Sequence, residues 1–240
     1  MGTKRTSVLA SLIGLGCLLS GEARATSLEI TPITVHFVPG TNATTIEIAN
    51  RGGVAAAIQL RAFAWRQDGN KDVLTPTQDI IISPPIFALA TDGSQTIRLM
   101  LRRAAFAAGE RTYRLLIDEV PPANFTPQQV AVAMRLSLPL IIGSAAARER
   151  PLQWRAARQP NGRVMLSATN SGSAFERVQS LFVTTADGRA QGVTTTATNS
   201  YVLAGAQRQW VVSAADNARE LKLRITTRTG QSEQVLAIAP

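Results

Sequence analysis

Short runs rich in Val, Ile, Leu and Thr recur along this sequence and limit the folds that it can adopt. Clusters of Gly, Pro, Asn and Asp separate these runs about every ten residues. Runs of this length, with apolar and polar side chains in alternation, are typical of strands in antiparallel sheets. The one stretch with helical character, Arg102–Gly109, is Ala-rich but short. The sequence therefore predicts an all-β protein.

The predicted strands fall into two sets. The first set is Leu28–Val38, Ala43–Asn50, Ala55–Gln67, Ile80–Ile82, Gln95–Leu101, Arg111–Val120 and Val130–Ile142. The second set is Leu152–Arg158, Arg163–Asn170, Val178–Thr185, Ser200–Val202, Gln207–Ser213, Leu221–Thr227 and Glu233–Ile238. A small, charged stretch at 144–151 separates them, and we expect it to be a hinge. Domains at 26–143 and 152–240 each have the size of an immunoglobulin-like β-sandwich.

The first 25 residues have the features of a secretory signal peptide. Two basic residues precede an apolar run, Val8–Leu19, which is too short to span a bilayer. Small residues lie at the positions that a cleavage site after Ala25 requires. A lipid-attachment site at Cys17 is the alternative, but it would place the cut inside the apolar run. We therefore expect a secreted protein that begins at Thr26 and has no integral membrane segment.

Charge and cysteine content restrict the classes of partner. Cleavage would remove the only cysteine, so the secreted chain would have no disulfide. Cleavage would also remove three of 25 basic and one of 16 acidic residues, which leaves a net charge of +7. The remaining basic residues are scattered and do not interleave with aromatic residues, which argues against a nucleic-acid partner. Attraction to acidic protein subunits or to a membrane surface is the alternative to a merely soluble basic surface.

Groups suited to catalysis are scarce. The only histidine, His36, lies in an alternating strand, where we expect a solvated or hydrogen-bonded side chain. The adjacent Asp118 and Glu119 should point to opposite faces of a strand, so they cannot act as a paired acid and base. The sequence contains no nucleophile elbow, phosphate-binding glycine loop or metal-ligand spacing. We expect no catalytic residue, metal site or cofactor, which argues against a hydrolase.

Several segments together resemble the periplasmic chaperones of chaperone–usher pilus systems. They are Leu28–Phe37, Ala64–Gly69, Ile82–Ala90, Gln95–Leu99 and Tyr113–Pro122. The resemblance covers the secreted chain and implies two immunoglobulin-like sandwiches in a bent arrangement. It also implies a periplasmic protein that binds, folds and caps pilus subunits, delivers them to an outer-membrane usher, and can cap itself as an oligomer when free. Within the family, the chain resembles the archaic, or spore-coat-like, subgroup most, on the basis of Trp65–Gln67 and the Leu138–Pro139 step.

The resemblance implies a donor strand. Members of this family add an edge strand to an incomplete subunit, and the segment Val130–Leu138 resembles that strand. Its alternation places five apolar side chains on one face, namely Val130, Val132, Met134, Leu136 and Leu138. An ordinary core strand would show the same alternation, so the pattern alone leaves this alternative open.

The resemblance also raises the question of a carboxylate anchor. Better-known members hold the subunit's terminal carboxylate with one basic residue in the first strand and one in the last strand of the first domain. Thr34 falls at the first of these places, Pro139 falls at or beside the second, and neither residue is basic. We therefore expect Arg98 to be the anchor, because an arginine can bind a carboxylate bidentately. The alternative for Arg98 is an ion pair with Asp118 or Glu119. The weaker candidates for the anchor are Arg61, Arg114 and Arg135.

A different class of function is a secreted immunoglobulin-like protein with a structural or adhesive role at the cell surface. Such a protein would need a free N-terminal extension that it could donate to a neighbour. The first predicted strand begins at Leu28, almost at the predicted cleavage site. The sequence therefore favours the chaperone.

Overall fold

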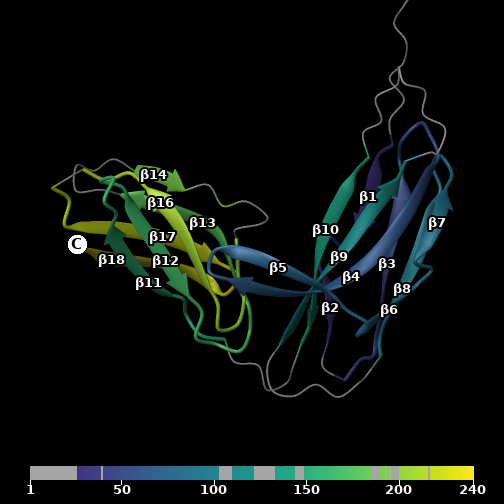
Figure 1. Cartoon of the computed structure of the whole chain (residues 1–240), viewed down its shortest axis with the longest axis horizontal. Coiled ribbons are helices and arrows are strands. Elements are labelled where there is room, and N and C mark those ends of the chain that lie inside the picture. The colour runs from purple at the N-terminus through teal and green to yellow at the C-terminus, as the bar shows by residue number, and fades with distance from the viewer. Residues whose placement is uncertain are drawn as a thin grey trace, which may run out of the picture.

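The computed structural model describes residues 26–38, 40–102, 110–121, 133–143, 149–184, 190–193, 195, 200–215 and 217–240. Every regular element in these ranges is a strand, which confirms the predicted all-β class. Figure 1 shows two bodies of strands set at an angle, one built from β1 to β10 and the other from β11 to β18. None of the described residues forms a helix that could cross a membrane.

Some predicted features lie outside the described residues. They are the signal peptide with Cys17 and Ala25, nearly all of Arg102–Gly109, the donor positions Val130 and Val132, and most of the hinge. These features stay predictions.

The first domain is a sandwich of two sheets. Its strands are β1 (Leu28–Thr31), β2 (Val35–Phe37), β3 (Ala43–Asn50), β4 (Ala56–Asp68), β5 (Lys71–Pro76), β6 (Ile80–Ser83), β7 (Ile86–Leu89), β8 (Ser94–Leu101), β9 (Arg111–Val120) and β10 (Arg135–Ile142). One sheet has the order β1-β3-β8-β6, and the other has the order β2-β10-β9-β4-β5, with β7 also on β4. Alternate side chains of both sheets meet in one core, which includes Ile48, Leu99, Leu115 and Leu140.

At two places in this sandwich, the chain passes from one sheet to the other at a proline. The predicted strand Leu28–Val38 is in fact two strands, since β1 pairs with β3 whereas β2 pairs with β10. Pro32 lies between them and cannot donate a hydrogen bond to a ladder. In the same way, Pro84 and Pro85 separate β6, on β8, from β7, on β4. The strand predicted at Ile80–Ile82 was followed by no further predicted strand before Gln95, so β7 was missed.

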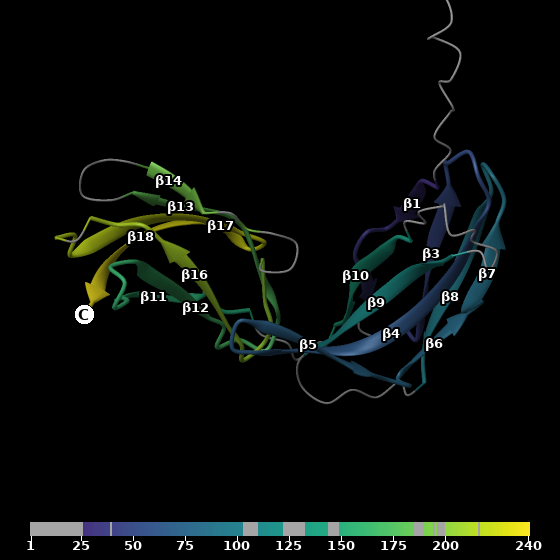
Figure 2. The ribbon, with the colours of Figure 1, turned by 45° about the horizontal axis from the view of Figure 1, so that its top comes forward.

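The β4–β5 hairpin was also missed. Its turn contains Gly69, whose φ of 55° lies in the left-handed region that favours glycine. The segment Lys71–Pro76 has no alternating apolar pattern, so its sequence does not predict a strand. In Figures 1 and 2 this hairpin extends from the first domain to the second, and it therefore contributes to the junction between them.

The second domain is also a layered β-structure. Its strands are β11 (Gln153–Arg158), β12 (Val164–Thr169), β13 (Glu176–Thr184), β14 (Ala190–Val193), β15 (Tyr201–Val202), β16 (Gln207–Val212), β17 (Glu220–Thr227) and β18 (Gly230–Ala239). Their order is β14-β13-β17-β18-β11-β12-β16, with β15 on β13. Strand β18 pairs with β17 along most of its length and with β11 at its end, so it joins the two layers. The core between the layers includes Trp154 and Trp210, whose ring centroids are 5.5 Å apart.

Both domains contain the same buried asparagine turn. The side chain of Asn50 accepts a hydrogen bond from the N–H two residues later, at 2.9 Å, and donates to the carbonyl four residues later, at 2.7 Å. Asn170 makes the corresponding bonds at 2.9 and 2.8 Å. Both asparagines are buried, so these bonds satisfy polar groups that water cannot reach.

Candidate functional site

The candidate functional site is an incompletely paired edge of β10. This strand pairs with β9 from Arg135 to Ile142, but on its other side β2 pairs only with Leu140–Ile142. Within the described residues, no strand lies beside the segment Arg135–Pro139 on the side away from β9. We call this side the open edge.

Two hydrogen bonds determine which backbone groups point to the open edge. The carbonyl of Met134 accepts a hydrogen bond from the N–H of Glu119 at 2.9 Å, on the β9 side. The N–H of Gly143 donates to the carbonyl of Phe37 at 2.9 Å, on the β2 side. Successive residues of a strand direct their backbone groups to opposite sides. The backbone N–H and C=O groups of the odd-numbered residues of β10 therefore point away from β9.

The open edge can therefore accept another strand. The N–H and C=O groups of Arg135 and Ser137 point towards it. The backbone of Pro139 also faces the open edge, and a proline has no N–H that would be left unpaired there. An exposed edge of this kind is a template for pairing with another chain.

The side chains of β10 show how far the predicted donor strand extends. Leu138 is only 6% exposed and belongs to the core of its own domain, as the ordinary core-strand alternative requires. Leu136 packs against the margin of that core, and Met134 is half-buried. The burial of Leu138 makes its side chain unavailable to a partner. The part of the predicted donor face left for a partner is Met134 and Leu136, together with the undescribed positions Val130 and Val132.

A charged cluster lies on the outer face of the sheet at the start of β10. Arg61 Nη2 donates to Asp118 Oδ2 at 2.7 Å, and Arg135 Nε donates to Asp118 Oδ1. Burial alone would raise the pKa of Asp118, but the two guanidinium groups hold this pKa below its ordinary value. The carboxylate therefore stays ionised between two cations.

The structure places the predicted anchor Arg98 on the other sheet. Arg98 lies on β8, opposite Thr45 and Ser83, with its side chain exposed. The alternative role, an ion pair with Asp118 or Glu119, is wrong, because both acidic residues lie on β9 and Asp118 already binds two arginines. The structure does not bring Arg98 to the open edge.

Arg114 lies at the end of the open edge. It is the partner of Pro139 in the register of β9 and β10. Its guanidinium carbon is 3.7 Å from the centroid of the Trp65 ring, and its side chain is only 7% exposed. Burial lowers the pKa of Arg114, and the carboxylate of Asp72, 3.8 Å away, opposes this shift. An arginine nevertheless stays protonated in proteins, so a buried cation lies next to Pro139.

A second buried arginine joins the two domains. Arg208, on β16, is 2% exposed and enters the β4–β5 hairpin, where Nη1 donates to the carbonyl of Asn70 at 2.6 Å and Nη2 donates to Asp72. Its Nε donates to the carbonyl of Tyr201 at 3.0 Å. Arg114 and Arg208 thus share the carboxylate of Asp72. No local sequence pattern marks Arg208 or Asp72, because the two residues in contact lie 136 positions apart in the chain.

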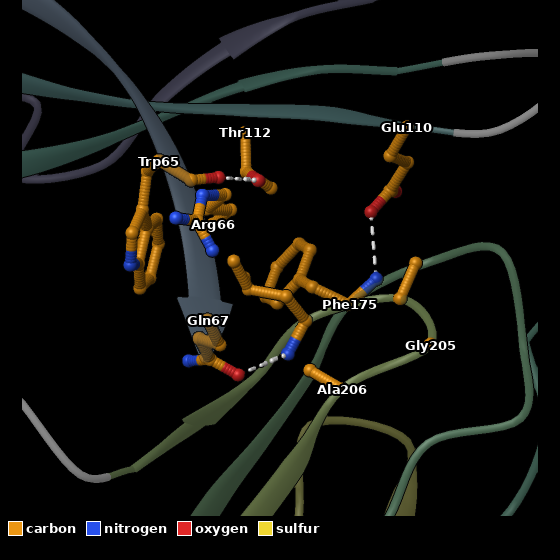
Figure 3. Close-up of a pocket in the computed structure, with 10 residues that line it drawn as sticks. Trp65, Arg66, Gln67, Glu110, Thr112, Phe175, Gly205 and Ala206 are labelled. Carbon is orange, nitrogen blue, oxygen red and sulfur yellow. Dashed lines mark hydrogen bonds between the residues drawn. The ribbon is translucent and has the colours of Figure 1, made fainter. Parts of the chain in front are cut away.

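A small apolar core completes the junction, and it consists of Trp65, Ile141, Phe175, Tyr201 and Leu203. A cavity of about 180 Å³ opens beside it, and Figure 3 shows the polar residues of its wall. Gln67 accepts a hydrogen bond from the N–H of Leu203 at 3.0 Å, and Glu110 accepts one from the N–H of Phe175 at 2.8 Å. These side chains bond to the backbone of the other domain, so the wall of the cavity holds the domains together.

His36 also contacts the second domain. Its ring centroid is 6.5 Å from that of Phe175. Burial, and then the charge of Arg228, lower the pKa of His36, so the imidazole is neutral at neutral pH. The described residues contain no group of three or more His, Cys, Asp or Glu side chains that could hold a metal ion.

Comparisons with known proteins agree with this architecture. Residues 27–145 match the family model of the PapD N-terminal domain of pili and flagellar-assembly chaperones. Comparison with the curated protein sequences finds no match.

Among similar solved structures, one is the complex of CsuC with the tip adhesion subunit CsuE, from archaic Csu pili of Acinetobacter baumannii. It has 24% identity and a TM-score of 0.65, over 89% of this chain and 100% of that chain. The E. coli chaperone DraB has 19% identity and a TM-score of 0.63, over 88% and 97% of the two chains. The complex of the Salmonella enterica pilin SafA with the SafB chaperone has 18% identity and a TM-score of 0.62, over 89% and 97%. At these identities the likeness shows the fold.

Proposed function

This chain belongs to the family of pili and flagellar-assembly chaperones through its PapD N-terminal domain, and we propose that it caps pilus subunits by adding β10 to them as a strand. The observation that carries this proposal is the open edge, with the outward-facing backbone groups of Arg135 and Ser137. An incomplete sandwich exposes unpaired strand edges and an apolar groove, and it would aggregate if left alone. Strand addition supplies backbone hydrogen bonds to those edges, while alternate side chains fill the groove.

The proposal includes where the protein acts and what it meets there. Secretion into the periplasm would follow from cleavage of residues 1–25, and the capped subunit would be delivered to an outer-membrane usher. Two of the similar structures, CsuC–CsuE and SafA–SafB, pair a chaperone with a pilus subunit, which supports pilus subunits as the partners of this chain. Without a subunit, the open edge of one copy is free to pair with a second copy in a self-capped oligomer.

Within this proposal, Arg114 is the anchor that the observations favour for the subunit's terminal carboxylate. A strand added at the open edge must stop before Leu140, where β2 begins to pair with β10. The last open residue is Pro139, and Arg114 is the residue opposite it on β9. Arg114 and Arg208 share one carboxylate, so this region has an excess of positive charge. The indole N–H of Trp65 is buried there without a hydrogen-bond partner in the described part of the chain. By contrast, Arg61 and Arg135 are already paired with Asp118.

The backbone of Ser137 provides a direct test of strand addition. Ser137→Pro removes an N–H that points to the open edge and leaves the ladder with β9 intact, so we expect the variant to fold. Subunit binding should weaken by at least about tenfold, because a hydrogen bond worth about 1 kcal/mol is lost and the proline ring obstructs the incoming strand. The measurement is recovery of soluble complex from periplasm after co-expression with a pilus subunit. Ser137→Ala, which keeps the N–H, is the control, and normal capture by Ser137→Pro would refute strand addition at this edge.

The proposed anchor can be tested with two forms of one peptide. A peptide that copies the C-terminal strand of a pilus subunit is prepared with a free carboxylate and with an amide at its end. The wild-type protein should prefer the free acid by about tenfold or more, since a charge-assisted bond to a buried guanidinium is strong. Arg114→Gln should lose this preference, whereas Arg98→Gln should keep it. If Arg98→Gln alone loses the preference, the anchor lies on β8 and the assignment to Arg114 is wrong.

A further inference from the structure

Glu119 joins two segments that meet at the start of β10. The hydroxyl of Thr26 donates to Glu119 Oε1 at 2.9 Å, and the N–H of Met134 lies 3.3 Å from Oε2, to which it donates. The N–H of Glu119 donates in turn to the carbonyl of Met134 at 2.9 Å. One carboxylate thus connects the beginning of the described chain to the residue that precedes β10.

The carboxylate of Glu119 has no basic partner among the described residues, unlike its neighbours. Asp118 binds Arg61 and Arg135 on the outer face of the sheet. Glu29, on β1, binds Arg51 at 2.8 Å. Glu119 instead binds two neutral donors, the hydroxyl of Thr26 and the N–H of Met134. This half-buried carboxylate is therefore available to a further cation.

Cleavage after Ala25 would create such a cation. Hydrolysis of the Ala25–Thr26 peptide bond by water leaves a carboxylate on Ala25 and an α-ammonium on Thr26. The α-nitrogen is three bonds from the Thr26 hydroxyl oxygen, and so within about 4 Å of it. An α-ammonium has an ordinary pKa of about 7.7–8.0, so it is largely charged at neutral pH. Because both residues are half-buried, solvent screens an ion pair between this ammonium and Glu119 only in part.

We propose that Glu119 is a positioning residue that binds the new N-terminus of the processed protein and holds Met134 in place at the start of the donor strand. Removal of the signal peptide would then complete the binding edge, because in the precursor the nitrogen of Thr26 is an uncharged amide. The proposal rests on the proposed function and on cleavage after Ala25, and it adds an internal carboxylate that couples processing to the edge that captures subunits.

The test compares two N-termini of the full secreted chain, one that begins at Thr26 and one that retains Ala25. Nuclear magnetic resonance should show a pKa of the Thr26 α-ammonium above the ordinary range. The Met134 amide should exchange with solvent several-fold more slowly at pH 7 in the chain that begins at Thr26. Glu119→Gln keeps one of the two acceptor oxygens but has no charge, so it should return this pKa to the ordinary range and abolish the difference in exchange between the two N-termini. The matched control Glu29→Gln should change neither.

An ordinary pKa together with equal exchange of Met134 in both chains would overturn the proposal. Neither measurement needs a subunit, so they are independent of the proposed function. Subunit capture after co-expression is the third readout, and Glu119→Gln should weaken it several-fold. If the first two readouts behave as expected while the wild-type protein captures no subunit, the proposed function fails and the ion pair stands.

Discussion

Replacement of Met134 by lysine should abolish subunit capture and leave the protein folded. Met134 is half-buried and lies next to Glu119, whose carboxylate can accommodate a lysine in the free chaperone. When β10 is added to a subunit, the ammonium would have to enter an apolar pocket. A buried charge without a partner costs several kcal/mol, and each 1.4 kcal/mol lowers affinity about tenfold. We therefore expect a loss of more than about a hundredfold.

Two control variants make the Met134 result specific. Met134→Leu keeps an apolar side chain and should retain capture. Ala133→Ser alters an exposed neighbour on the opposite face and should bind nearly normally. The measurement is soluble complex in periplasmic extract after co-expression, once circular dichroism has shown that each variant is folded. Equal recovery for Met134→Lys and Ala133→Ser would mean that β10 serves only its own domain, and the strand-addition mechanism would have to be abandoned.

Replacement of Arg208 by leucine should produce the largest loss of stability. Among the described residues, the variant would leave Asp72 with Arg114, at 3.8 Å, as its one basic partner and with the Gln67 amide, which donates to it at 3.3 Å. It would also remove the donors to the carbonyls of Asn70 and Tyr201. Removing one partner of a buried ion pair costs about 3–5 kcal/mol, because the remaining charge loses its compensation. We expect a lower midpoint of urea unfolding and a larger radius of gyration in small-angle X-ray scattering, since Arg208 connects the domains.

Arg224 is the matched control for Arg208. It lies in the same domain and donates to Glu233 at 2.8 Å, but the two side chains are 62% and 69% exposed. Exposed ion pairs contribute about 0–1 kcal/mol, so Arg224→Leu should leave the unfolding midpoint almost unchanged. Equal effects of the two substitutions would show that the junction between the domains does not depend on the buried pair.

The all-β class and most of the strands follow from the amino-acid sequence alone. Alternation of apolar residues and the turn-forming Gly, Pro and Asn are local properties, and strands such as Ala43–Asn50 and Arg111–Val120 match the prediction. Local patterns do not record which strand pairs with which. Tertiary pairing therefore accounts for three features that were not predicted: the division of Leu28–Val38 between two sheets, the strand that follows Pro85, and β5.

The same limit applies to the candidate site. Alternation marked Met134, Leu136 and Leu138 as one face, but only the packing of the domain showed that Leu138 is used by its own core. The resemblance left several arginines as candidate anchors, and only the register of β9 and β10 placed Arg114 beside Pro139. The shared carboxylate of Asp72 and the contact of Glu119 with Thr26 join residues far apart in the chain. Such contacts depend on how the sheets and domains pack, because burial and the distance between charges arise only when remote segments are brought together.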